Sequence, residues 1–513
     1  MAASSHPLST LTAVNILQKG GNAVDAAVAA IAVQCVVEPG STGIGGDCFC
    51  IIAPKGSDKL IGYNGSGPAP AAATPEWFAK QGITKIERHT PHSVTIPGAV
   101  DGWARLIADH GRLGLGEVLE PAIRFARDGY PIASRVAFDF NNEVDTLSRD
   151  ATARRIFLPG GKPPRVGQLH RQPELAATLA LIAEKGRDAF YGGPVAKDMV
   201  DYLRGLGGLH TMDDFAAHQG EYVTPIRTAY RGYDVCEIPP NGQGLTALIL
   251  LNILSGFDMA QYAPMSPERL HLEIEATRLA YADRNAFIAD PRHAKVPVED
   301  LLSAAHADDL RALITPGKAM TSVPRPQLPT HPDTVYLCVV DEDRTAVSFI
   351  NSLFNGFGSG LVAPKTGVVL QNRGCGFVLD PAHPNCIAPR KRPFHTIIPG
   401  MLAKGGRAVM PFGVMGGAYQ ACGHAHVLGG ILDHGLDIQE AMDQSRVFPT
   451  REGVVEVESS LPAETLYALH KYGHRTGAPS KPQGGSQAIW IDWDEGVLTG
   501  GSDPRKDGCA IGY

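Results

Sequence analysis

The chain contains 513 residues, of which 44% are hydrophobic, and carries a formal net charge of -7 at pH 7. A chain of this length can bury a large core, and length alone predicts about two to four domains. Acidic residues outnumber basic ones, 53 to 46, and no basic run is interleaved with aromatic residues. The composition therefore argues against a nucleic-acid partner.

The N-terminal region predicts a buried helix and neither an export signal nor a membrane segment. Residues 1–6 lack the basic and apolar regions of a signal peptide. Residues 22–37 are rich in alanine and predict a buried helix. The apolar part of this helix, residues 26–37, is interrupted by Gln34 and is too short to span a bilayer. We therefore expect no membrane partner and a cytoplasmic location, with a periplasmic or secreted location as the alternative.

An amphipathic helix and then a β-hairpin are predicted in the centre of the chain. The helix is expected at 268–286, and a proline-rich loop follows at 324–332. Residues 334–350 have the β-branched and aromatic pattern of two strands around a polar turn. With a three-residue loop at 342–344, Thr334 lies directly opposite Ser352. Two hydroxyls then meet at the open end of the hairpin, although such pairs are also ordinary sheet stabilisers.

A pair of glycines follows the apolar strand predicted at 410–415 and precedes a helix-like stretch at 418–428. The backbone amides of Gly416 and Gly417 can approach an oxyanion closely, because no side chain blocks them. Amides at a helix N-terminus are also ready anion donors. The pair is therefore a candidate oxyanion site, with an ordinary strand-to-helix turn as the alternative.

Three patterns that suggest metal, nucleotide or disulfide chemistry are weak. Cys422 and His426 share a face of the predicted helix, whereas His424 points away, which argues against a metal site. The glycine run at 356–360 lacks a Walker lysine and a strand–loop–helix context. Nine cysteines, an odd number without framework spacing, predict free thiols. We expect no metal and no cofactor.

Short strings that occur in order along the chain carry a family resemblance. They are GGNAVDAA at 20–27, EPGSTGIGG at 38–46, DTVYLCVVD at 333–341, GFGSG at 356–360, KRP at 391–393 and GG at 416–417. Together they resemble the gamma-glutamyltranspeptidase family, whose members are N-terminal nucleophile hydrolases. The resemblance implies an α+β fold, a four-layer αββα sandwich. A large subunit, residues 1–333, and a small subunit, residues 334–513, would form it jointly as one interlaced domain.

The resemblance also implies a catalytic set. In this family the small subunit begins with the nucleophile, which corresponds to Thr334, and a glycine pair forms the oxyanion hole, which corresponds to Gly416 and Gly417. The α-amine released by cleavage, with an unperturbed pKa near 8, can take the hydroxyl proton. Ser352 joins this set because the hairpin register places its hydroxyl beside Thr334. The implied partners are the two cleavage fragments as a heterodimer, a small-molecule amide substrate, and water or an amine as acceptor.

The sequence departs from the family where the glutamyl group is bound. True transpeptidases hold the α-carboxylate with an arginine and a Ser-Ser pair, where this chain has Ser66 and the pair His395 and Thr396. The groups that hold the glutamyl amine are replaced as well, by Phe354, Arg373 and Gly376. These departures resemble the acylase-type branch of the family.

The candidate substrate contacts are Asn351, Asn355, Arg373, His395 and Thr396. Arg373 either binds a substrate carboxylate from a new direction or is a structural residue that pairs with an acid. We predict an autoprocessing amidohydrolase or acyltransferase that cleaves a gamma-glutamyl or similar carboxylate-bearing acyl amide. The alternatives are a cephalosporin-acylase-like or other amide hydrolase and, outside this class, a non-catalytic paralogue.

Overall fold

The computed structural model of the protein describes residues 1–322, 333–450 and 452–513, with the backbone alone of Asp333. The proline-rich loop expected at 324–332 lies outside the described residues. Among those described, no helix is both long enough and apolar enough to cross a membrane.

Two β-sheets form the centre of the molecule. The first has seven strands in the order β18 (Cys509–Ile511), β1 (Ala2–Ser4), β9 (Asp333–Val340), β10 (Ala346–Phe354), β2 (Asp47–Ala53), β3 (Ile61–Gly65) and β6 (Glu221–Val223). The second has six strands in the order β17 (Leu498–Ser502), β16 (Gly485–Ile491), β12 (Arg407–Met415), β11 (Gly400–Lys404), β8 (Tyr233–Glu237) and β7 (Ile226–Tyr230). Buried side chains of both sheets, including Tyr336, Ile350 and Met401, form one hydrophobic cluster.

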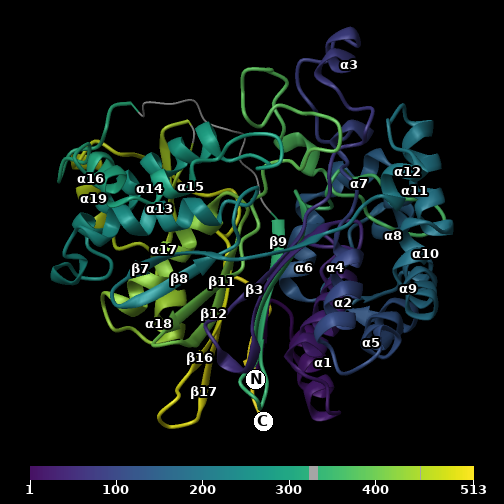
Figure 1. Cartoon of the computed structure of the whole chain (residues 1–513), viewed down its shortest axis with the longest axis horizontal. Helices are drawn as coiled ribbons and strands as arrows, with labels where there is room; N and C mark the ends of the chain where they lie inside the picture. The colour runs from purple at the N-terminus through teal and green to yellow at the C-terminus, as the bar shows by residue number, and fades with distance from the viewer. Residues whose placement is uncertain (323–332, 451) are drawn as a thin grey trace.

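Helices cover the outer face of each sheet, so that the molecule has four layers (Figure 1). On the first sheet lie α2 (Ala23–Val37) and α4 (Ala99–His110), backed by α1 (Pro7–Gln18), α5 (Leu115–Asp128) and α9 (Pro173–Lys185). On the second lie α13 (Gly244–Ser255), α17 (Tyr419–Leu432) and α18 (Ile438–Asp443), backed by α14 (Pro267–Phe287). The predicted αββα sandwich is confirmed.

The parts of the chain before and after position 333 interlace in both sheets. In the first sheet β9 lies between β1, from the start of the chain, and β10. In the second, β8 from the earlier part pairs with β11 from the later part. The two termini meet as well, since Ala2 of β1 pairs with Ile511 of β18, and they lie close together in Figure 1. Both sheets are therefore built from both parts of the chain.

The alanine-rich segment forms the predicted buried helix. In α2 every residue is buried, and Asn22 caps its N-terminus in a capping box with Asp25. A helix so rich in alanine allows close packing on both sides, against β9 and β10 on one side and α1 and α5 on the other.

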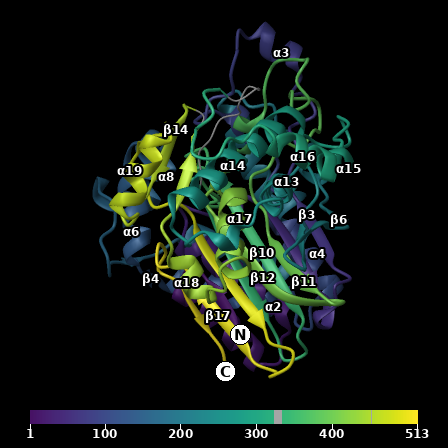
Figure 2. The same cartoon turned by 90° about the vertical axis from the view of Figure 1, so that its left-hand side faces the viewer.

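The helix predicted at 268–286 is present as α14, but it is not amphipathic. Nearly all of its residues from Arg269 to Asn285 are buried. A second layer covers the helix on the side of Leu270 and Ile274, which pack against α19 (Ala463–Lys471) and β13 (Val447–Pro449) (Figure 2). β13 belongs to a small sheet with β14 (Val454–Val457) and β15 (Arg475–Gly477). The charges of α14 are paired inside the protein, as between Arg278 and Glu275 at 2.9 Å.

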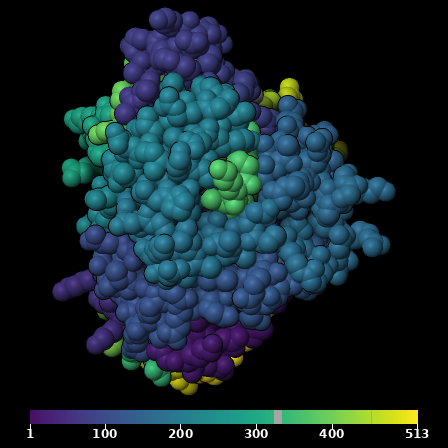
Figure 3. Space-filling model, turned by 90° about the vertical axis from the view of Figure 1, so that its right-hand side faces the viewer, coloured from purple at the N-terminus to yellow at the C-terminus, as the bar shows by residue number. Residues whose placement is uncertain are grey.

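The right-hand side of the molecule in Figure 1 faces the viewer in Figure 3, and its surface belongs mainly to the N-terminal part of the chain. A small green patch from the later part of the chain emerges in this surface. Contacts of this kind occur at Thr366, whose amide donates to Asp198 of α11 (Pro194–Gly205) and whose carbonyl accepts from Thr178 of α9. The later part of the chain is thus anchored in the helical layer as well as in the sheets.

Candidate active site

The hairpin has the predicted register. Val340 pairs with Ala346 and Val335 with Asn351, and the Asp341 amide donates to the Thr345 carbonyl at 3.1 Å. Beyond Asn351 the register shifts by a bulge, where Phe354 has a positive φ of 83° and pairs with Asp333. β-Bulges often occur next to active sites, where they redirect side chains.

The predicted hydroxyl pair is present at this bulge. Thr334 Oγ1 donates to Ser352 Oγ at 3.1 Å, and the Phe354 amide donates to the same oxygen at 2.9 Å. Thr334 is buried, only 2% exposed. Both hydroxyls lie on the face of the first sheet that packs against the second, because they alternate with Val335 and Asn351 along the strands.

Arg373 lies directly beside this pair. Its Nη2 donates to Ser352 Oγ at 3.0 Å and its Nη1 donates to Thr396 Oγ1 at 2.8 Å, while the guanidinium stacks 4.3 Å from the Phe354 ring centre. The side chain is fully buried, and burial lowers its pKa to about 9. Within the described residues no carboxylate lies within 4.0 Å of it; the nearby charge of Asp47 opposes the shift. A buried cation held by hydroxyls is suited to receive an anion.

Asp47 and His395 are buried near Arg373 and hydrogen-bond to each other. The His395 Nδ1 accepts from the Ile397 amide, so its Nε2–H donates to Asp47 at 3.0 Å. Asp47 also accepts from the Gly67 and Gly98 amides and from Gln371. Burial raises the pKa of Asp47 to about 7, against the effect of Arg373. Burial and the neighbouring arginines hold the pKa of His395 well below its usual value, so this ring is neutral.

The glycine pair connects β12 to α17, as expected. Gly416 and Gly417 have positive φ angles of 115° and 54°. The Gly416 carbonyl accepts from the Tyr419 amide, so the pair forms the turn that leads into the helix. Among the described residues, neither glycine amide donates to another group of the chain. These N–H groups are therefore available to an oxyanion.

Two glutamines tie this turn to the other groups. Gln243 Nε2 donates to both the Gly417 and the Thr396 carbonyls at 2.7 Å. Gln420, in the first turn of α17, reaches Thr334 Oγ1 with its Nε2 at 3.5 Å. The hydroxyl pair, the glycine turn and the segment of Thr396 thus form one connected site.

The two predicted asparagines lie in different places. Asn351 is on the opposite face of the sheet from Ser352, where its side chain donates to Thr42 at 2.8 Å and to the Gly43 carbonyl at 3.2 Å. The structure does not bring Asn351 to the hydroxyl pair. Asn355 lies just beyond the bulge, and its side-chain oxygen accepts from Asn372 at 2.7 Å.

A pocket of about 520 Å³ opens beside Asn355. Its wall includes Phe354, Cys375, Ile86 and Lys85. Phe354 connects this pocket to the site, since its amide bonds to Ser352 and its ring covers Arg373. Phe354 therefore lies between the pocket and the hydroxyl pair, and the pocket is large enough for a sizeable part of a substrate.

Ser66 contributes no charge to the site. It is fully buried and donates to Asn64 at 2.7 Å. The guanidinium in this site is that of Arg373, which comes from a different part of the chain.

The sequence analysis missed Asp47, Gln243, Gln371 and Gln420. A signal existed for two of them. Asp47 directly follows the glycine string at 38–46, and Gln243 stands between two glycines in the stretch PPNGQG at 239–244, at the start of α13. Polar residues adjacent to glycine-rich turns are common in sites, but only the packing of the two sheets identifies their partners.

The cysteine and the two histidines of α17 face two different acids. Cys422 and His426 face Glu273, whereas His424 Nδ1 contacts Glu237 at 2.6 Å, so the predicted division of faces is confirmed. All nine cysteines are free, as predicted.

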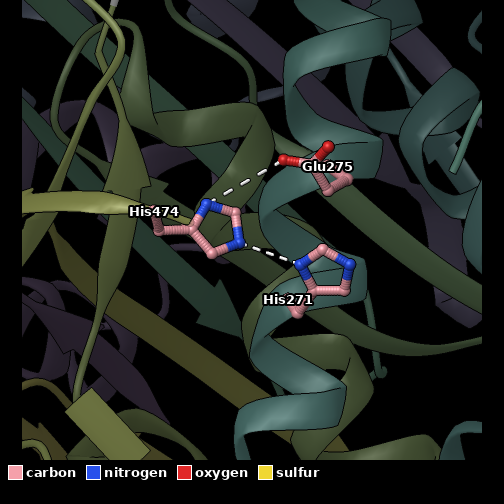
Figure 4. A group of neighbouring side chains, drawn as sticks. All are labelled: His271, Glu275 and His474. Carbon is pink, nitrogen blue, oxygen red and sulfur yellow. Dashed lines mark hydrogen bonds and ion pairs between the residues drawn. The ribbon is translucent and has the colours of Figure 1, made fainter. Parts of the chain in front are cut away.

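One other group of three possible metal ligands occurs among the described residues: His271, Glu275 and His474 (Figure 4). His271 Nε2 donates to the Thr315 carbonyl, so its Nδ1 accepts from His474 Nε2 at 2.8 Å. The other nitrogen of His474 faces Glu275 at 4.0 Å. One ligand atom from each of the three side chains lies within 4.8 Å of the others, which is close enough for a shared metal ion. In this structure, however, His474 is hydrogen-bonded to His271 and only lies near Glu275.

Comparison with known proteins agrees with this geometry. The family model for gamma-glutamyltranspeptidase matches residues 9–513. The chain belongs to the gamma-glutamyltranspeptidase family. It is 39% identical to the glutathione hydrolase-like YwrD proenzyme of Bacillus subtilis, across 100% of this chain and 98% of that protein. It is 34% identical to the acylase ACY 1 proenzyme of Pseudomonas sp. (strain SE83), across 100% and 93%.

Among solved structures, the cephalosporin acylase from Bacillus halodurans matches with a TM-score of 0.93 and 41% identity, across 99% of this chain and 94% of that one. This member of the gamma-glutamyltranspeptidase family is thus an enzyme with the N-terminal nucleophile hydrolase fold. Its relatives include both glutathione hydrolase-like proteins and acylases.

Proposed function

We propose that the protein is an autoprocessing amidohydrolase or acyltransferase that uses Thr334 as its nucleophile. The contact between Thr334 Oγ1 and Ser352 Oγ at the start of β9 carries this proposal. It is supported by the Gly416–Gly417 turn, which Gln420 connects to the same hydroxyl.

Maturation would begin with attack of Thr334 Oγ1 on the carbonyl carbon of Asp333. The C–N bond breaks, the nitrogen takes the hydroxyl proton, and an ester forms. Water then hydrolyses the ester and leaves a carboxylate on Asp333 and a free α-amine on Thr334. The products are residues 1–333 and 334–513, which remain together as a heterodimer because their strands alternate in the first sheet and pair through β8 and β11 in the second.

Turnover would use the same hydroxyl. The α-amine accepts its proton, the oxygen attacks the substrate amide, and the Gly416 and Gly417 amides stabilise the oxyanion. When the C–N bond breaks, the proton passes to the leaving amine. Water or an acceptor amine then releases the acyl group from Thr334. Ser352 orients the nucleophile, and Arg373 holds Ser352.

The substrate we propose is an acyl amide with a carboxylate on the acyl group, gamma-glutamyl or similar. Arg373 supports this choice, because it is a buried cation beside Ser352 without a carboxylate within 4.0 Å among the described residues. Thr396 presents its hydroxyl to the same guanidinium, and His395 orients the wall behind it. The pocket beside Asn355 would receive the leaving amine.

A cephalosporin-acylase-like activity is the second candidate. The replacement of the family arginine by Ser66 favours it, because a gamma-glutamyl substrate loses its usual charge partner there. Cleavage of glutaryl amides in preference to gamma-glutamyl amides would support this candidate.

The protein on a denaturing gel tests the proposal. Wild type and Thr334→Ser should give fragments of 333 and 180 residues, 180 being 513 minus 333, whereas Thr334→Ala should remain one chain. Thr334→Ser is the matched control because it keeps the hydroxyl. If the smaller fragment begins at any residue other than Thr334, the assignment is wrong, and a wild type that stays intact favours a non-catalytic paralogue.

A further inference from the structure

A second cavity, of about 130 Å³, is lined by Arg292, Arg390 and Arg392 together with His218 and Asp214. None of the proposed catalytic or substrate-binding residues lines it. Two of its three arginines are paired with acids, Arg292 with Asp290 and Arg392 with Glu221, whereas Arg390 has no acidic partner among the described residues.

Arg392 is the buried part of the cavity wall. It is 3% exposed, and its Nη2 donates a long hydrogen bond of 3.4 Å to the Gln219 carbonyl. Its Nε has no hydrogen-bond partner. Its Nη1 pairs with Glu221, whose own side chain is 46% exposed. The nearby charge of Arg292 adds to burial in lowering the pKa of Arg392. Glu221 and Asp290 oppose this shift, but the buried Nε–H of Arg392 still has no acceptor.

The remaining charges leave Arg390 as the cation of this cavity without an acidic partner in the described part of the chain. Arg292 holds Asp290 at 2.6 Å but is still 45% exposed. Arg390 is exposed and has no ion pair or side-chain hydrogen bond within the described residues. The Asp214 carboxylate is occupied by the Ala71 and Thr211 amides and the Thr211 hydroxyl.

His218 adds a second buried nitrogen atom without a hydrogen-bond partner. It is 3% exposed and its Nε2 has no hydrogen bond. Burial lowers its pKa to about 4, and Arg392, Arg187 and Arg292 act in the same direction. The ring is therefore neutral and can donate one N–H without adding charge.

We propose that this cavity binds a small oxyanion, a carboxylate or a phosphate, through Arg292, Arg390 and Arg392. Its volume equals that of about four water molecules at 30 Å³ each, which suits an anion of this size. Planar guanidinium groups recognise carboxylate and phosphate oxygens in pairs.

Calorimetric titration of the full-length protein with inorganic phosphate, and separately with succinate, tests the site. Ionic strength is held constant with sodium chloride. We expect saturable binding of at least one of the two, and the one that binds identifies the preferred oxyanion. Arg390→Gln should weaken binding about tenfold, the effect of losing one charge-assisted hydrogen bond.

Two further variants make the test specific. Arg165→Gln removes another exposed arginine that lies outside the cavity and should bind as wild type does. Ala217→Phe fills the cavity from its exposed rim without a change in charge and should abolish binding. The proposal is overturned if neither anion binds saturably, or if Arg390→Gln and Arg165→Gln behave alike.

Discussion

Replacement of Arg373 by glutamine separates the two interpretations of this residue. The change removes the charge but keeps an amide that can donate to Ser352 or Thr396, whose oxygens now lie 3.0 and 2.8 Å from the guanidinium. If Arg373 binds the substrate carboxylate, the variant should lose discrimination between charged and neutral acyl groups. If Arg373 only supports the site, all substrates should suffer equally.

The magnitude follows from the hydrogen bonds. Each terminal nitrogen of the guanidinium carries two N–H groups and donates one of them within the chain, so one on each remains for a carboxylate. A contact of this charge-assisted kind contributes about 1.5–3 kcal/mol, which corresponds to roughly ten- to 150-fold in kcat/KM. The variant should also be less stable, because Asp47 loses a cation that lowers its pKa.

The assay measures kcat/KM for the gamma-glutamyl, glutaryl and pentanoyl derivatives of one anilide. In Arg373→Gln the first two should fall together by ten- to 150-fold relative to the third. Arg269→Gln is the control, since it removes another buried arginine, in α14, and should leave the ratios unchanged. An unchanged ratio in Arg373→Gln would refute the carboxylate contact. A strong wild-type preference for gamma-glutamyl that survives the change would mean that other residues form the glutamyl site.

Three further predictions concern the turn, the hydroxyl pair and stability. Gly417→Val should lower kcat by roughly 10²–10³, because it displaces an oxyanion donor. Gly435→Val is the control, since Gly435 has another left-handed backbone conformation with open space around it, and it should leave kcat unchanged. Equal kcat values for the two variants would contradict the oxyanion role. Ser352→Ala should slow self-cleavage on a timed gel, because Thr334 loses its 3.1 Å partner; an unchanged rate would remove Ser352 from the catalytic set. Burial and neighbouring charges lower the pKa of His474 to about 3. Between pH 6.5 and 3 the unfolded chain therefore binds a proton at this histidine that the folded chain does not. The stabilising effect of the neutral histidine is complete above pH 6.5 and is lost on acidification. His474→Gln should therefore reduce the pH dependence of the unfolding free energy by up to about 1.4 kcal/mol per pH unit near pH 5, and the exposed His470→Gln should not; equal slopes in urea titrations would contradict this.

The sequence alone was enough to predict the elements closest to the proposed nucleophile, because their geometry depends on neighbouring residues. The loop length of the hairpin determines its register, and register alone places Thr334 opposite Ser352. The alternation of side chains along β10 also puts Asn351 on the face away from Ser352, so the position of this asparagine could have been inferred. The turn at Gly416 and Gly417 is likewise local, because positive φ angles favour glycine.

Tertiary structure decided what surrounds these elements. Arg373 reaches Ser352 and Thr396 only because the two sheets pack face to face, and nothing in the residues next to Arg373 indicates either partner. Asp47 and His395 are far apart in the chain, yet they meet in the same wall. The buried polar face of α14 has the same origin, since a periodic pattern cannot reveal that a second layer will cover it. Short-range geometry depends on neighbouring residues, whereas burial, charge pairing and pKa depend on elements that only the complete fold brings together.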